Sequence, residues 1–183
     1  MVPDQWLIIE RLGDIILNHA EGCVFEIGIG HSTLILKKFA DIFDRTMYCF
    51  DQSERKCNWA KEQGCKIFQG KSLKTMQKFP DIPVAMGLID GRHDAKTCRA
   101  EAEFFVPRLS IGGVVFIHDT YLVNDRKIRV ESHPRGPAGD MYLVRQELQA
   151  TKDLQVFTWP YTAGDCGLTM VLKEDPERGY QRQ

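Results

Sequence analysis

Residues 24–33 read Val-Phe-Glu-Ile-Gly-Ile-Gly-His-Ser-Thr, an apolar stretch with one acidic residue that runs through two glycines into a helical pattern. Gly28 and Gly30 are expected to let the backbone turn sharply with positive φ, and neither places a Cβ in the path of a ligand. The helix that follows directs its free N–H groups and the positive end of its dipole at the same place. The segment therefore predicts a nucleotide-type ligand at the carboxyl end of a first parallel strand.

The residues around the two glycines indicate which kind of nucleotide to expect. Thr33 stands where the dinucleotide fingerprint Gly-x-Gly-x-x-Gly has its third glycine, beside the pyrophosphate. Glu26 lies two residues before Gly28, and its carboxylate would repel a pyrophosphate but attract an ammonium or sulfonium group. The loop therefore favours a cationic adenosine cofactor over a dinucleotide. A glycine-rich turn that binds nothing is the alternative.

The bulk composition fits a single domain with no attraction to polyanions. Of the 183 residues, 43% are hydrophobic and 27% are charged, so the chain can bury a core. A formal net charge of −1 gives no global pull toward nucleic acid or an anionic membrane. No apolar run approaches the ~20 residues that span a bilayer, and the N-terminus has no signal-peptide layout. Six cysteines without a Cys-x-x-Cys pair indicate reduced thiols and a cytoplasmic location.

Apolar strands alternate with amphipathic helices along the chain. The expected strands cover residues 23–27, 47–50, 66–69, 84–89, 114–117, 154–158 and 168–172. The expected helices cover residues 4–19, 32–43, 53–63, 73–79, 95–109 and 141–150. Such an order predicts an α/β fold with a Rossmann-like, doubly wound, mostly parallel seven-stranded sheet and an antiparallel edge strand.

Several local features refine this prediction. Pro107 is expected to kink or shorten the fifth helix, and residues 111–113 are expected to form a turn. The last two strands are joined by a loop too short for a helical crossover, so they are expected to pair antiparallel. We expect one domain over residues 1–183, made up of a lead-in helix, an active-site loop and a frayed tail at residues 1–20, 120–140 and 174–183.

Polar residues follow the expected parallel strands, at the edge where open α/β sheets bind ligands. Asp51 lies 21 residues after Gly30, a spacing at which an acidic residue accepts hydrogen bonds from ribose; a solvated turn aspartate is the alternative. Ser72 follows the third strand, where it could contact an adenine edge or cap a helix.

Two further carboxylates end the fourth and fifth strands. Asp90 and Asp119 are expected to converge there, and two carboxylates suit a hard cation such as Mg²⁺; helix or turn capping is the alternative. His93 lies three residues after Asp90 and could act as a general base, or be merely solvated.

These segments resemble the class I S-adenosylmethionine-dependent methyltransferases. The resemblance is carried by Glu-Ile-Gly-x-Gly-x-Ser-Thr (26–33), Asp51, Leu-Ile-Asp-Gly-x-His (88–93) and Gly-Gly-x-x-x-x-His-Asp-Thr (112–120). It spans roughly residues 20–120 and is closest to the small O-methyltransferase branch, which holds catechol-type and macrolide-sugar O-methyltransferases and cephalosporin-hydroxylase-like proteins. The Ile-Asp-Gly-x-His segment is its most specific part.

The resemblance implies S-adenosylmethionine as cofactor, with Mg²⁺ as a candidate second one. It implies a cofactor-binding set that comprises Glu26, Gly28, Gly30, Ser32, Asp51, Ser72 and Asp90. It further implies that Asp90 and His93 are catalytic, His93 as base, and that Asp90 and Asp119 bind the metal. The sugar enzymes have an acidic residue where this chain has His118, and Mg²⁺ prefers oxygen ligands.

We therefore expect an enzyme that methylates a hydroxyl of a small molecule, with no nucleic acid or membrane partner and a homodimer left open. The excess positive charge of the 120–140 loop favours an acidic or phosphorylated acceptor, and a solvated lid is the alternative. Three other functions stay open: a methyltransferase of RNA or protein, a nucleotide-binding oxidoreductase, and a non-catalytic cofactor-binding protein. Thr33 and Glu26 disfavour the oxidoreductase.

Overall fold

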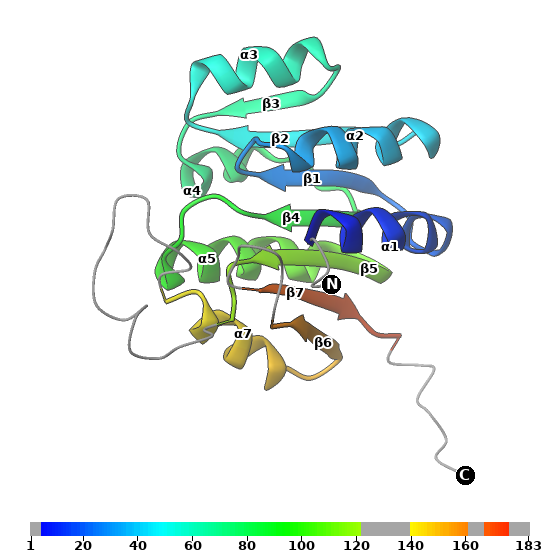
Figure 1. The fold of residues 1–183 in the computed structure, drawn as a ribbon, viewed down its shortest axis with the longest axis vertical. Coiled ribbons are helices and arrows are strands. Elements are labelled where there is room, and N and C mark those ends of the chain that lie inside the picture. Colours follow the sequence, from blue (N-terminus) through cyan, green and yellow to red (C-terminus); the bar gives the residue numbers. More distant parts are fainter. Residues whose placement is uncertain (1–4, 122–139, 161–166, 176–183) are drawn as a thin grey trace.

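The computed structural model describes residues 5–121, 140–160 and 167–175, which form a seven-stranded sheet in the order β3-β2-β1-β4-β5-β7-β6 (Figure 1). The strands are β1 (Cys23–Ile27), β2 (Met47–Asp51), β3 (Lys66–Gln69), β4 (Val84–Ile89), β5 (Leu109–His118), β6 (Leu154–Trp159) and β7 (Leu168–Lys173). The α-helices are α1 (Gln5–His19), α2 (Ser32–Ile42), α3 (Glu54–Glu62), α4 (Ser72–Thr75), α5 (Ala95–Phe105) and α7 (Tyr142–Gln149). The predicted Rossmann-like fold class is confirmed.

The central strands are parallel, and the helices that connect them cover both faces of the sheet. Every residue of β1 and of β4 is buried, which explains why these segments are apolar throughout, apart from Glu26, rather than alternating. One core lies between the sheet and helices α1, α2 and α3, and a second lies between the sheet and helices α5 and α7 (Figure 1). Helices on both faces leave the ends of the strands as the open places on the sheet.

The antiparallel pairing predicted for the last two strands is confirmed. β6 pairs antiparallel with β7, and β7 also pairs antiparallel with β5. The strand that runs against the others is therefore β7, one position in from the edge, and β6 forms the edge itself.

Two expectations on the fifth strand and the helix before it have different outcomes. The turn expected at residues 111–113 is wrong, because β5 begins at Leu109 and continues through the two glycines with Gly112 at φ +76°. The pairing of β4 with β5 shifts register there, which accommodates the extra residues as an irregularity in the strand. Helix α5 ends early at Phe105, as Pro107 predicted, and a 3₁₀ turn follows over Val106–Arg108.

The predicted short helix over residues 73–79 is present as two pieces, α4 and a 3₁₀ turn at Met76–Lys78. The central part of the loop expected at 120–140 and the last residues of the expected tail lie outside the described residues, as does Cys166. The other five cysteines are buried free thiols. None of the helices in the described ranges combines the length and apolarity of a bilayer crossing.

Strand register places the predicted site residues beside one another. Ile27 pairs with Phe50 on one side and with Ile89 on the other, and Ile89 pairs with Ile117. Because the strands are parallel, the residues that follow these positions emerge at the same edge of the sheet. The edge therefore carries Gly28, Asp51, Asp90 and His118 from four adjacent strands.

A close contact between β1 and β4 holds the centre of the second core. The Phe25 ring stacks on Phe105 with centroids 3.8 Å apart, and it also lies against the backbone of Gly87. A Cβ built at Gly87 would lie 1.9 Å from a ring carbon of Phe25. Only glycine leaves this ring in its place against α5.

Gly87→Ala is therefore expected to destabilise the protein by about 1–3 kcal/mol, because the buried Phe25 ring has no space into which it can move. Gly30→Ala is the control, since a Cβ there meets no atom within 4 Å. Urea unfolding of both variants measures the difference. Equal stability of Gly87→Ala and the wild type would contradict this account of the core.

Candidate active site

Gly28 brings the loop after β1 into close contact with the loop after β4. Its φ is +93°, as predicted, and its N–H donates a hydrogen bond to the Phe50 carbonyl at 2.9 Å. A Cβ at this position would lie 2.1 Å from the carbonyl oxygen of Asp90. The prediction of positive φ is wrong for Gly30, which contributes open space instead. Gly28 thus allows the two loops to approach each other closely, whereas Gly30 leaves the space beside the loop open.

Glu26 is fully buried beneath this loop and holds it in shape. Its two carboxyl oxygens accept hydrogen bonds from the Ser32 and Thr33 hydroxyls, each at 2.5 Å. The Thr33 hydroxyl in turn accepts a hydrogen bond from the Gly30 N–H at 3.0 Å. Burial raises the pKa of Glu26 to about 8, although the two hydroxyls oppose the rise. Direct contact of Glu26 or Ser32 with a cofactor stays a prediction.

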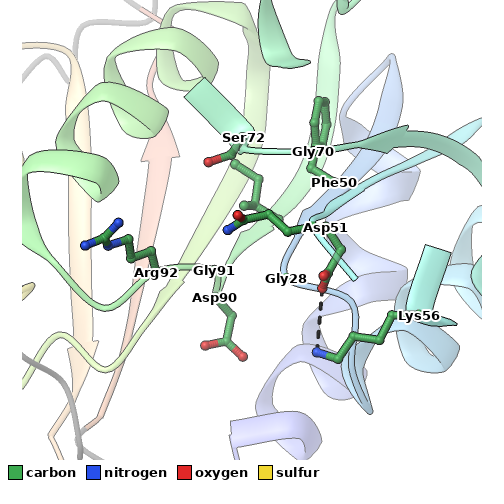
Figure 2. A pocket seen from close by; sticks show the side chains of 11 residues that line it. Gly28, Phe50, Asp51, Lys56, Gly70, Ser72, Asp90, Gly91 and Arg92 are labelled. Carbon is green, nitrogen blue, oxygen red and sulfur yellow. Dashed lines mark ion pairs between the residues drawn. The ribbon is translucent and has the colours of Figure 1, made fainter. Parts of the chain in front are cut away.

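Asp51 ties the glycine loop to the start of α3. One carboxylate oxygen accepts a hydrogen bond from the Ile29 N–H at 3.0 Å, and the other accepts one from the Ser53 N–H at 2.7 Å. The ammonium group of Lys56 lies 3.6 Å from the first oxygen (Figure 2). Asp51 therefore has a fixed position at the edge of the sheet, with Lys56 beside it.

A cavity of about 320 Å³ opens at the carboxyl ends of β1, β2 and β4 (Figure 2). Its volume is within the range of small-molecule sites, which start at roughly 300 Å³. The cavity holds four of the predicted site residues, whereas Glu26, Gly30 and Ser32 do not line it. Its lining consists of Ile27, Gly28, Phe50, Asp51, Gln52, Lys56, Gly70, Ser72, Asp90, Gly91 and Arg92.

Asp90 links this cavity to a cluster of two aspartates and two histidines. The His93 ring lies between the aspartates, with Nδ1 2.9 Å from Asp119 Oδ2 and Nε2 3.3 Å from Asp90 Oδ1. His118 Nδ1 lies 3.0 Å from Asp90 Oδ1 and 3.4 Å from Asp119 Oδ1. Asp119 has a φ of +56°, and its side chain is nearly fully buried. The predicted convergence of the two aspartates thus includes both imidazoles.

The two aspartates determine the charge of His93. Hydrogen bonds to Asp119 and Asp90 raise its pKa to about 10 and outweigh the effect of burial. Burial would raise the pKa of Asp90, but its hydrogen bonds to His118 and His93 prevail and lower it. At neutral pH the cluster therefore contains a His93 imidazolium between carboxylates. A general base at this position must first lose that proton.

The described residues contain no group of three or more His, Cys, Asp or Glu side chains arranged to hold a metal ion. The imidazolium of His93 lies between the carboxylates that the sequence assigned to Mg²⁺. Besides these carboxylates the cluster offers imidazole nitrogens, which Mg²⁺ binds poorly. The residues as arranged do not fit the ion.

Sequence reasoning missed two residues beside the site. Trp6, on α1, stacks on His118 with centroids 5.4 Å apart, so the N-terminal helix reaches the aspartate–histidine cluster. Lys56 places a cation beside Asp51. The helical spacing of Trp6 indicated core packing only, and no local signal distinguishes Lys56 from Lys61, the other exposed lysine of α3.

Solved structures of methyltransferases share this fold. A candidate caffeoyl-CoA O-methyltransferase from Staphylococcus aureus aligns with a TM-score of 0.72 and 20% identity, over 94% of this chain and 86% of its own. The O-methyltransferase from Bacillus cereus, in complex with SAH, aligns with a TM-score of 0.68 and 17% identity, over 95% of this chain and 82% of its own. TomG from Streptomyces achromogenes is an O-methyltransferase of tomaymycin synthesis and was solved in complex with SAM. It aligns with a TM-score of 0.65 and 18% identity, over 93% of this chain and 80% of its own.

A search of curated protein sequences finds no match. The family model described as a methyltransferase domain matches residues 25–120, more than half of the chain, which includes the glycine loop, Asp51, Asp90, His93 and Asp119. The resemblance noted in the sequence is thereby confirmed, and the chain belongs to the methyltransferase-domain family.

Proposed function

We propose that this protein is an S-adenosylmethionine-dependent methyltransferase that methylates a hydroxyl group of a small molecule. The observation that carries the proposal is the position of Asp90, which lines the cavity and also contacts the aspartate–histidine cluster. A cofactor in the cavity and an acceptor at the cluster would then meet at one residue. The same assignment is supported by the similar structures of O-methyltransferases that contain SAH or SAM.

The cavity offers suitable groups for each part of the cofactor. Asp51 would accept hydrogen bonds from the ribose hydroxyls, and Ser72 would contact the adenine edge. The open space at Gly30 leaves room for the methionine portion along the loop, whose shape Glu26 and Ser32 maintain. The cofactor, when bound, supplies a methyl group on a sulfonium sulfur that retains the electrons of the broken C–S bond.

His93 would accept the proton of the acceptor hydroxyl. Its Nδ1 makes the shorter contact, to Asp119, and would keep its proton there. The Nε2 atom, 3.3 Å from Asp90, would be the acceptor once it is deprotonated. Asp90 and Asp119 then orient the ring and stabilise the imidazolium that forms. The oxygen of the acceptor thus gains a methyl group as its proton passes to Nε2.

A Mg²⁺-assisted form of the same reaction is the second candidate. It is favoured by the convergence of Asp90 and Asp119, because Mg²⁺ is held by one or two carboxylates with water and substrate oxygens. It would require His93 to leave its present position between them.

Transfer of labelled methyl groups from S-adenosylmethionine to a panel of small hydroxylated compounds tests the proposed class. We expect a labelled methyl ether and equimolar S-adenosylhomocysteine from the wild-type chain. Label that appears only in RNA or protein would contradict the proposal, and so would the absence of transfer when the cofactor binds.

Asp51→Asn is expected to weaken S-adenosylhomocysteine binding about 10- to 100-fold, since hydrogen bonds to a charged group are lost. Asp81→Asn, at an exposed loop position, is the matched control and should bind as the wild type does. Isothermal titration calorimetry measures both. Unchanged affinity in Asp51→Asn would remove Asp51 from the cofactor site.

The rate of transfer is expected to increase with pH from neutrality toward pH 10, because the pKa of His93 is raised to about 10 and only its neutral form accepts a proton. His93→Gln should lower the rate about 10²- to 10⁴-fold and remove this pH dependence. His19→Gln, at the exposed end of α1, serves as control. A wild-type rate that is flat between pH 7 and pH 9 would exclude His93 as the base.

Chelation with EDTA is expected to leave the wild-type rate unchanged, because the His93 imidazolium already lies between the two carboxylates. Loss of activity on chelation, with recovery on addition of Mg²⁺, would instead establish the metal-assisted form.

A further inference from the structure

Glu101 is an acidic side chain enclosed in the core of the protein. It lies on the inward face of α5, in line with Cys98, Ala102 and Phe105, and its exposed fraction is 0%. Neither of its carboxyl oxygens has a hydrogen-bond partner among the described residues. A buried polar group without a partner costs free energy, so its presence requires a reason.

The carboxyl group of Glu101 lies directly behind the wall of the cofactor cavity. A Cβ built on Gly91 would be 3.8 Å from Glu101 Oε1, and Gly91 lines the cavity. Ser72, another lining residue (Figure 2), belongs to α4, which packs against α5. Burial raises the pKa of Glu101 to about 7, and the Ser72 hydroxyl lies near enough to moderate the rise. Glu101 therefore has one neighbouring hydroxyl that also faces the cavity.

We propose that Glu101 is a positioning residue that selects the adenine base of the cofactor through Ser72. A small rotation of both side chains lets the Ser72 hydroxyl donate its proton to the Glu101 carboxylate. The lone pairs of the Ser72 oxygen then face the cavity, where they accept a hydrogen bond from the 6-amino group of adenine. A base with a 6-oxo group offers no donor there and is rejected.

This inference rests on the proposed function, because it presumes an adenosyl ligand in the cavity. The inference goes beyond the proposed function because it assigns base selection to a residue that does not line the cavity. The alternative, in which Glu101 only affects folding, predicts no change in preference between bases.

Calorimetric titration of the full chain with S-adenosylhomocysteine and S-inosylhomocysteine distinguishes these cases. The wild type is expected to bind the adenosine compound at least about tenfold more tightly. In Glu101→Gln the side-chain amide can donate to Ser72 and reverse its hydroxyl, so this ratio should fall about tenfold. Ser72→Ala should lower the ratio similarly, and Glu103→Gln, on the exposed face of α5, should keep the wild-type ratio.

A wild-type ratio in Glu101→Gln, whatever its thermal stability, would overturn the inference. Should Glu101→Gln fail to fold, Ser72→Ala decides, and a wild-type ratio there overturns the inference too. A wild-type protein that binds both compounds equally would refute base selection but leave the proposed function standing. Failure to bind either compound would overturn both.

Discussion

The close approach of the Gly28 backbone to the carbonyl of Asp90 is the constraint on which the rest of the site depends. The Gly28 N–H donates to Phe50, and the Asp90 N–H donates to Ile27, so both loops leave the sheet as continuations of its hydrogen-bond ladder. A side chain at position 28 would collide with Asp90. The glycine loop and the aspartate–histidine cluster are therefore held together by backbone contact, which places the proposed cofactor and acceptor sites side by side.

Three acidic residues near this junction lie in different environments. Glu26 is neutralised by burial and satisfied by two hydroxyls, whereas Asp90 keeps a lowered pKa because imidazoles compensate its charge. Glu101 is buried without a hydrogen-bond partner among the described residues, and burial raises its pKa. An acidic side chain thus maintains a loop, holds a charged cluster or, as proposed, positions a hydroxyl, according to the groups packed around it.

Much of the fold could be predicted from local pattern. The bounds of β1 and β4 agree with those expected, because mainly apolar runs flanked by turn residues specify buried parallel strands. The bounds of β3, a partly exposed edge strand, also agree. The extent of β5 could not be predicted, since Gly112 and Gly113 are typical of a turn, whereas β5 pairs with β4 on both sides of them, at Leu109 and at Val114. Strand pairing there outweighs the local preference of the two glycines for a turn.

The candidate site was predictable as a set of positions but not as a set of contacts. Strand ends located Asp51, Asp90 and Asp119, because parallel strands present their carboxyl ends at one edge. The orientation of Glu26 toward its own loop and the placement of His93 between carboxylates depend on packing across elements. For Glu101 a signal existed: an acid occupies an apolar position of α5.

The most direct test of the central claim is calorimetric titration of the wild-type chain with S-adenosylhomocysteine and, separately, with NADH. A cavity built from the glycine loop, Asp51 and Asp90 predicts saturable binding of S-adenosylhomocysteine at one site per chain and no heat with NADH. Saturable binding of NADH without any response to S-adenosylhomocysteine would contradict it.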